Sequence, residues 1–169
     1  TDVMAFLYEI FLSFNDAAES KNMDFKFLPS VASYKMFIDK GYLDKVTYNL
    51  LSNAFKYTPS GGKVTFSVTV DEAKKQLVIS VADSGVGIPK EKRNELFKRF
   101  MQSSFSGSSV GVGLHLTHEL VCVHKGTIVY TENEGGGSIF TVSLPTDISV
   151  YEEKDFLIPH NVLLEEEEV

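Results

Sequence analysis

The chain has 169 residues, of which 43% are hydrophobic, and a mean hydropathy of −0.02, which suits one domain with a packed core and a terminal extension. No apolar run reaches the roughly 18 residues that a membrane span needs, and no secretory leader is visible. The single cysteine, Cys122, excludes a disulfide framework and fits a reducing compartment. The net charge of −7 lies entirely in residues 147–169, which hold eight acids and one lysine, whereas residues 1–146 hold fifteen of each sign and so lack the basic excess of a nucleic-acid binder.

The N-terminal third predicts one helix and two short strands. Residues 2–20 carry apolar side chains at helical spacing, with Thr1 or Asp2 as a possible N-cap. Two strands are predicted at residues 24–28 and 34–38.

A helix over residues 43–59, which ends at Thr58-Pro59, carries the first chemically informative pattern. Its apolar side chains fall on one face, suited to packing on a sheet: Leu43, Val46, Leu50, Ala54 and Tyr57. A second face, about a quarter-turn away, carries Asn49, Asn53 and Lys56. Carboxamide oxygens suit Mg²⁺ and a lysine answers phosphate charge. The alternative is that both asparagines are ordinary residues of a helix surface.

Residues 63–70 and 76–82 alternate as a hairpin, and the second strand runs into the turn Asp83-Ser84-Gly85-Val86-Gly87-Ile88-Pro89. A carboxylate at this place can accept a hydrogen bond from an exocyclic amine. Gly85 and Gly87 let the backbone pass close to a flat ring. This describes recognition of adenine rather than guanine, which has a carbonyl where adenine has its amine. The alternative is an ordinary Asp-Gly turn.

The remainder predicts two helices, a loop and a closing hairpin. A short helix is predicted over residues 90–101 and carries Phe97 and Phe100. Residues 102–109 hold five serines and no Lys or Arg, a composition that predicts a mobile loop. Gly111-Val112-Gly113-Leu114 opens a helix that runs to about residue 125, a reasonable phosphate cradle because glycine amides and a helix N-terminus both favour anions. Strands at residues 127–133 and 138–144 close the domain.

This order of elements predicts an α/β two-layer sandwich, with a mixed, mostly antiparallel sheet against about three helices, rather than a doubly wound parallel sheet. Periodicity fades from residue 147, and residues 165–168 are four consecutive glutamates that we expect to be solvated. The predicted organisation is therefore a domain over residues 1–146 and an acidic linker or tail over residues 147–169.

The ordered set of motifs resembles the N, G1, F and G2 boxes of the catalytic ATP-binding domain of sensor histidine kinases, a GHKL family with the Bergerat fold. The matching segments are the Asn-x-x-x-Asn-Ala-x-Lys-Tyr-Thr-Pro helix, the Asp-x-Gly-x-Gly-Ile-Pro turn, Phe-x-x-Phe, the loop and Gly-x-Gly-Leu. The amino-acid pattern of residues 51–59 is most similar to that of hybrid two-component sensors.

The resemblance implies a site for Mg²⁺ and ATP. By analogy, Asn49 and Asn53 hold Mg²⁺ and the phosphates with support from Lys56, and Asp83 reads the adenine amine with Ser84 assisting through water. The resemblance further implies that Phe97 and Phe100 anchor the lid. The full set that it implies for ATP is Asn49, Asn53, Lys56, Tyr57, Asp83, Ser84, Gly85, Gly87, Ile88, Phe97, Arg99, Phe100, Gly111, Val112, Gly113 and Leu114.

Asn49 discriminates within the superfamily. The ATP hydrolases and the serine kinases of the superfamily resemble a pattern with Glu four residues before the Asn-Ala asparagine, where this chain has Asn49. An amide cannot take a proton from water or from a hydroxyl, whereas a histidine nitrogen already has a lone pair. The pattern therefore favours a protein histidine kinase; a degenerate nucleotide-sensing module and an ATP-hydrolysing conformational switch are the alternatives.

The histidine that would accept the phosphoryl group is expected on dimerisation helices outside this chain. His118-Glu119-Leu120 looks superficially like an acceptor box but lacks the following proline and lies within the helix after the glycines. His124 matches a structural His-x-Gly before the closing hairpin, His115 replaces a small residue near the expected phosphates, and His160 lies in the tail.

Two positions depart from the family pattern, and several properties of a longer protein follow from the resemblance. Ser109 stands where a leading glycine is usual, and the loop has no cation between Gln102 and Val110. Both features put tight ATP binding in question. The resemblance implies a cytoplasmic domain of an inner-membrane, homodimeric sensor that works with a response-regulator receiver domain and binds no nucleic acid itself.

Overall fold

The computed structural model describes residues 1–97 and 110–147, with no account of the side chains of residues 110–112. The elements in chain order are α1 (Val3–Ser13), α2 (Asn15–Ser20), β1 (Asp24–Pro29), α3 (Lys40–Tyr57), β2 (Lys63–Asp71), β3 (Gln76–Asp83), the 3₁₀-helix η1 (Lys90–Glu95), α4 (Val110–Val123), β4 (Thr127–Glu132) and β5 (Ser138–Pro145). Within these residues, no helix is long and apolar enough to cross a bilayer.

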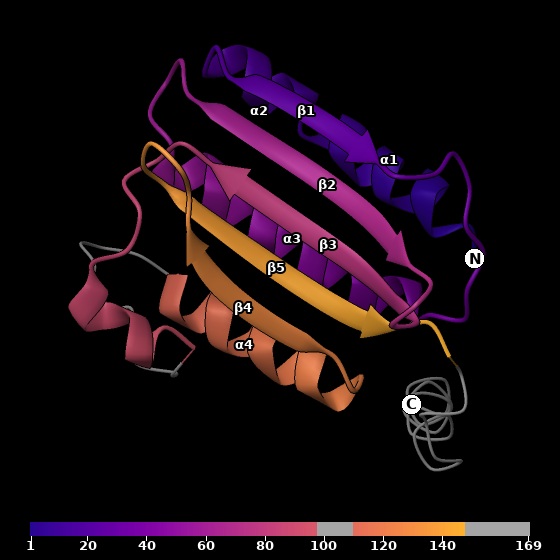
Figure 1. The fold of residues 1–169 in the computed structure, drawn as a ribbon. Coiled ribbons are helices and arrows are strands. Elements are labelled where there is room, and N and C mark those ends of the chain that lie inside the picture. The colour runs from indigo at the N-terminus through magenta and orange to yellow at the C-terminus, as the bar shows by residue number, and fades with distance from the viewer. Residues whose placement is uncertain (98–109, 148–169) are drawn as a thin grey trace, which may run out of the picture.

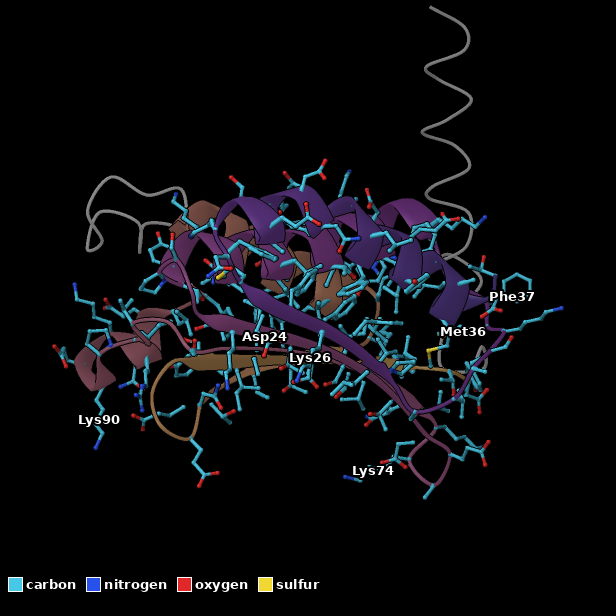
Figure 2. All side chains as sticks on the ribbon, turned by 90° about the horizontal axis from the view of Figure 1, so that it is seen from above. Asp24, Lys26, Met36, Phe37, Lys74 and Lys90 are labelled. Carbon is cyan, nitrogen blue, oxygen red and sulfur yellow. The ribbon has the colours of Figure 1, made fainter. Side chains whose placement is uncertain are left out.

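The five strands form one mixed sheet in the order β1-β2-β3-β5-β4 (Figure 1). β1 pairs with β2 in parallel, and the other three pairings are antiparallel. The α-helices lie on one face of this sheet, so the molecule has two layers (Figure 2). This architecture confirms the predicted α/β sandwich with a mostly antiparallel sheet.

The core lies between the two layers because the strands alternate strictly. The buried residues of β2, β3 and β5 face the helices: Val64, Phe66, Val68, Leu77, Ile79, Val81, Phe140, Val142 and Leu144. Burying a side chain of this size stabilises the fold by roughly 1.5–3 kcal/mol. The opposite face is polar, as shown by Asp24 and Lys26, which lie on the side of β1 away from the helices (Figure 2).

α3 runs along the middle of the helical layer and begins at Lys40, three residues earlier than predicted. Asp39 caps it, since its Oδ1 accepts a hydrogen bond from the Tyr42 amide at 3.1 Å. The predicted apolar face is buried at Leu43, Val46, Leu50 and Ala54, whereas Tyr57 at its end is half-buried. The packing of α3 thereby fixes the positions of Asn49 and Asn53 in the helical layer.

The C-terminal end of α3 is capped by a lysine from another element. Lys21, which follows α2, donates from Nζ to the carbonyl oxygen of Phe55 and, at 2.7 Å, to that of Thr58. These two carbonyls lack donors within the helix, so the ammonium satisfies them and complements the negative end of the helix dipole.

Three details of the sequence prediction were wrong. The single helix predicted over residues 2–20 divides at Phe14 into α1 and α2. Among the described residues, the segment predicted as a strand at residues 34–38 forms one isolated bridge, Lys35 to Asp2, because it lies along the start of α1. The Val3 amide donates to the Tyr34 carbonyl oxygen at 2.9 Å, and the Asp2 carboxylate accepts from the Ser33 hydroxyl at 2.7 Å and the Tyr34 amide at 3.2 Å. The hydrogen bond from Ser33 is the largest cause that lowers the pKa of Asp2, and the bond from the Tyr34 amide adds to it.

The third difference lies in the helix predicted over residues 90–101. The structure has η1 over Lys90–Glu95, followed by Leu96, which is almost fully buried. A 3₁₀ turn is a common short connector of this kind. Residues 98–109, which include the end of that helix and the predicted mobile loop, lie outside the described residues.

Candidate functional site

Asp83 is the last residue of β3 and is 3% exposed. Its Oδ1 accepts hydrogen bonds from the amides of Gly85 at 2.9 Å and Ser138 at 3.2 Å. Burial raises the pKa of Asp83, and these two amide bonds partly oppose the rise. The fold therefore holds a carboxylate where little water reaches it, so a hydrogen bond from a ligand to its other oxygen would be strong.

The turn between β4 and β5 braces the Asp83 backbone. Asn133 Nδ2 donates to the Asp83 carbonyl oxygen at 2.8 Å. Gly137 has φ +107°, and a Cβ at this position would stand 2.0 Å from the same oxygen, so only glycine allows this approach. The sequence does not indicate this role, because the contact joins residues more than fifty positions apart.

The glycines after Asp83 bring the turn against the end of α3. A Cβ on Gly85 would lie 2.4 Å from the Tyr57 carbonyl oxygen, and Gly87 has φ +69°. The amide of Ile88 donates to the Tyr130 hydroxyl at 3.2 Å, which fixes the far end of the turn to β4. Both glycines lie against protein backbone on the side where a Cβ would stand, and their predicted approach to a flat ring stays a prediction.

A cavity of about 30 Å³ opens between α3 and this turn, lined by Asn53, Tyr57, Asp83, Val86, Gly87, Ile88 and Ser138. Its volume accommodates a water molecule or an amino group, rather than a whole purine. The Oδ1 atom of Asn53 is buried and has no hydrogen-bond partner within the described residues. A buried acceptor in this state is costly unless a ligand or water satisfies it, and Asn53 is one of the residues that line the cavity.

Asn49 stands one turn before Asn53 and contacts α4. Its Nδ2 donates to the Thr117 hydroxyl at 3.2 Å, and that hydroxyl donates to the Gly113 carbonyl at 2.8 Å. The part of the chain that the structure describes has no cluster of three or more His, Cys, Asp or Glu side chains suited to a metal. Two carboxamide oxygens, of which that of Asn53 is buried without a partner in the described part of the chain, fit a hard cation such as Mg²⁺ if phosphate and water supply its remaining ligands.

Several other predicted residues do not line the cavity. Lys56 is exposed, with Nζ 5.8 Å from the Tyr57 ring centroid. Ser84 is exposed too, and its hydroxyl accepts from the Lys63 amide at 2.8 Å, so it does not line the cavity. Phe97 stacks on His118, with ring centroids 5.3 Å apart, and packs edge-on against Phe140.

The predicted phosphate cradle forms the start of α4. Gly111, Val112, Gly113 and Leu114 all lie in the first five residues of this helix, and Leu114 is buried. Arg99 and Phe100, predicted to bind ATP, lie outside the described residues.

The three histidines within the described residues make local contacts. Nδ1 of His115 is 3.1 Å from the Phe97 carbonyl oxygen. His124 stacks on Tyr42 with ring centroids 3.5 Å apart, in keeping with its expected structural role. Nε2 of His118 lies 3.7 Å from the sulfur of Cys122 on an outer face of α4.

Among the curated proteins, the chain is similar to histidine kinases. The chain is 38% identical over 152 residues to histidine kinase P4 of Formosa agariphila. This alignment covers 85% of this chain and 11% of that protein. It is 40% identical over 112 residues to the sensor histidine kinase WalK of Bacillus subtilis, which covers 64% of this chain and 18% of WalK. The chain thus spans less than a fifth of the length of either relative.

The fold has close counterparts among solved structures. The catalytic domain of histidine kinase ThkA matches with a TM-score of 0.75 over 86% of this chain and 94% of that domain, at 23% identity. Residues 38–148, which hold α3, the Asp83 turn and α4, match the family described as histidine kinase-, DNA gyrase B- and HSP90-like ATPases. The chain belongs to this ATPase family, and its relatives within it are histidine kinases.

Proposed function

We propose that this chain binds ATP with Mg²⁺ and transfers the γ-phosphoryl group to a histidine on a separate helical dimerisation domain. The observation that carries the proposal is the cavity lined by both the buried Asp83 and Asn53, whose buried Oδ1 has no hydrogen-bond partner within the described residues. A solved relative in fold, full-length ShkA, is in complex with the nucleotide analogue AMPPNP. This supports a nucleotide as the ligand.

In this proposal the base end of the nucleotide is read by Asp83. Its free oxygen accepts from the adenine amine in the small cavity, and Tyr57, Gly85, Gly87 and Ile88 contact the ring. The base lies partly outside the present cavity, whose volume of about 30 Å³ holds only the amine. Ser84 is proposed to assist through water, since its hydroxyl accepts from the Lys63 amide and keeps its own proton to donate.

The phosphate end is proposed to lie between α3 and the start of α4. Asn49 and Asn53 would hold Mg²⁺, which when bound offsets the charge of the phosphates. Lys56 is exposed and long enough to approach them from the rim. The amides of Gly111, Val112 and Gly113 in the first turn of α4 would donate to phosphate oxygens. We keep Leu114, Phe97, Arg99 and Phe100 as proposed contacts on the strength of the motif alone.

The reaction needs orientation more than proton transfer. The lone pair of a neutral imidazole nitrogen forms the N–P bond while the bond from the γ-phosphorus to the bridging oxygen breaks, and ADP leaves with that electron pair. Asn49 occupies the position at which a hydrolase would place a general base, and an amide cannot perform that role. The site therefore favours transfer to histidine over hydrolysis by water.

A non-catalytic nucleotide sensor is the second candidate. Ser109, at the place of a usual glycine, and the absence of Lys or Arg from residues 102–109 favour it, because both weaken the expected hold on phosphate. Measured binding of ATP without any phosphoryl transfer would support this candidate.

The larger protein is proposed to be a homodimeric, membrane-associated sensor of hybrid type with this domain in the cytoplasm. Residues 1–146 would form the ATP-binding domain and residues 147–169 a linker. A response-regulator receiver domain is the proposed downstream partner, since ThkA, a relative in fold, has been solved in complex with response regulator protein TrrA.

Calorimetry tests the ligand. The 169-residue chain should bind ATP in the presence of Mg²⁺, and Asn53→Ala and Asp83→Ala should each remove measurable binding while the melting temperature stays within a few degrees. Phosphate release by the isolated chain should remain at the background rate. Rapid phosphate release that depends on Asn49 would contradict the kinase assignment.

A further inference from the structure

The link between α3 and α4 through Thr117 has a specific chemical consequence for Asn49. Thr117 is fully buried, on the second turn of α4, and its hydroxyl donates to the Gly113 carbonyl oxygen, four residues earlier, at 2.8 Å. A hydroxyl has one proton. Because that proton is used within α4, the oxygen of Thr117 can only accept a hydrogen bond from Asn49.

This constraint orients the Asn49 carboxamide. An amide can present either NH₂ or C=O to a neighbour, and here the NH₂ group is the one that bonds to Thr117, at 3.2 Å. The Oδ1 atom of Asn49 makes no hydrogen bond within the described residues, and it is the atom that a hard cation would bind.

We infer that Thr117 is a positioning residue, which holds the Asn49 carboxamide with its oxygen presented to Mg²⁺ and thereby ties the metal ligand to the first turns of α4. This inference rests on the proposed function, since it assumes that Asn49 is a metal ligand. Neither the sequence motif nor the family match assigns a role to Thr117.

The chain supplies a matched control in Thr47. This residue is also a fully buried threonine, on α3, but its hydroxyl has no hydrogen-bond partner among the described residues. Thr117→Val and Thr47→Val therefore make the same change of atoms in two buried settings, and only the first removes a contact to Asn49.

The measured quantity is the ratio of the affinities of a non-hydrolysable ATP analogue in Mg²⁺ and in EDTA, determined by calorimetry on the 169-residue chain. A buried hydrogen bond of this kind corresponds to about a three- to tenfold change in an equilibrium constant. Thr117→Val should lower the ratio by this factor and leave the affinity in EDTA unchanged. Thr117→Ser, which keeps the hydroxyl, and Thr47→Val should retain the wild-type ratio.

Each contrary result has a separate meaning. If Asn49→Ala leaves the ratio unchanged, the proposed metal role of Asn49 is wrong. If Asn49→Ala lowers the ratio but Thr117→Val does not, or if Thr117→Val weakens binding equally in Mg²⁺ and EDTA, the positioning role is wrong. Loss of the ratio in Thr117→Ser would overturn it too, because the methyl group would then be the part that matters. Should Thr117→Val fail to fold, Thr117→Ala against Thr117→Ser gives the same comparison.

Discussion

Replacing Asp83 by asparagine separates the charge of this side chain from its shape. Asparagine keeps an Oδ1 that can accept from the amides of Gly85 and Ser138, as the carboxylate does. The other oxygen becomes an NH₂ group, which donates. Because burial raises the pKa of Asp83, the ionised form is disfavoured in the fold. The free energy of unfolding of Asp83→Asn at neutral pH should therefore equal or exceed that of the wild type.

Binding should respond in the opposite direction. A hydrogen bond to a charged acceptor contributes about 1.5–3 kcal/mol, so ATP should bind Asp83→Asn roughly 10- to 150-fold more weakly. ITP carries a carbonyl where ATP carries its amine. That carbonyl can accept from the new NH₂ group, so the variant should prefer ITP to ATP, the reverse of the wild type.

The assay is calorimetric titration of ATP and ITP into the wild type, Asp83→Asn and Asp24→Asn, with thermal melting of each. Asp24 is an exposed aspartate on the open side of the sheet, so its substitution should leave both affinities unchanged. If Asp83→Asn keeps its fold but loses ATP and ITP to the same degree, Asp83 does not read the base. Unchanged ATP affinity would place the nucleotide elsewhere.

Three further predictions concern stability and pH. Lys21→Met removes the cap of α3 and should lower the free energy of unfolding by about 1–2 kcal/mol, whereas Lys26→Met, which loses only an exposed ion pair, should change it by less than about 0.5 kcal/mol in urea denaturation. In Gly137→Ala and Gly135→Ala, the new alanine must adopt a positive φ, which should lower the free energy of unfolding by about 1–3 kcal/mol in each. Only Gly137→Ala also places a Cβ against the Asp83 carbonyl oxygen, so it alone should abolish ATP binding measured by calorimetry. The contribution of Asp83 to the free energy of unfolding should be complete below its ordinary pKa of 3.8 and should be lost as pH rises through its raised pKa in the folded state. The amount by which Asp83→Asn exceeds the wild type in free energy of unfolding should therefore increase with pH. A decrease with pH would contradict the burial argument.

The local pattern was sufficient to predict most of the elements and their arrangement. α3, the β2–β3 hairpin and the closing β4–β5 hairpin were predicted because their apolar residues repeat at helical or strand spacing. The strand predicted at residues 34–38 shows the limit of this reasoning. Alternation at Tyr34, Met36 and Ile38 indicates a strand, but a strand of the sheet also needs a neighbouring strand. Among the described residues, the backbone of this segment pairs only with residues 1–3 at the start of α1.

The site could be predicted in part. The sequence indicates Asp83 and Asn53 through their motifs, and the structure brings both to one cavity. The residues that hold them were missed: Asn133 on the Asp83 carbonyl and Thr117 on Asn49. Both contacts join elements more than forty residues apart, and neither leaves a periodic or motif signal in the sequence.

Transfer of phosphate to a histidine tests the central claim most directly. The 169-residue chain would be incubated with Mg²⁺, ATP labelled at the γ-phosphate and a purified histidine-bearing dimerisation domain, in parallel with Asn53→Ala. We predict acid-labile label on the histidine of the helical domain, none on this chain, and none anywhere with Asn53→Ala. Label on His118 of this chain, or release of labelled phosphate to water with the helical domain unmodified, would contradict the account.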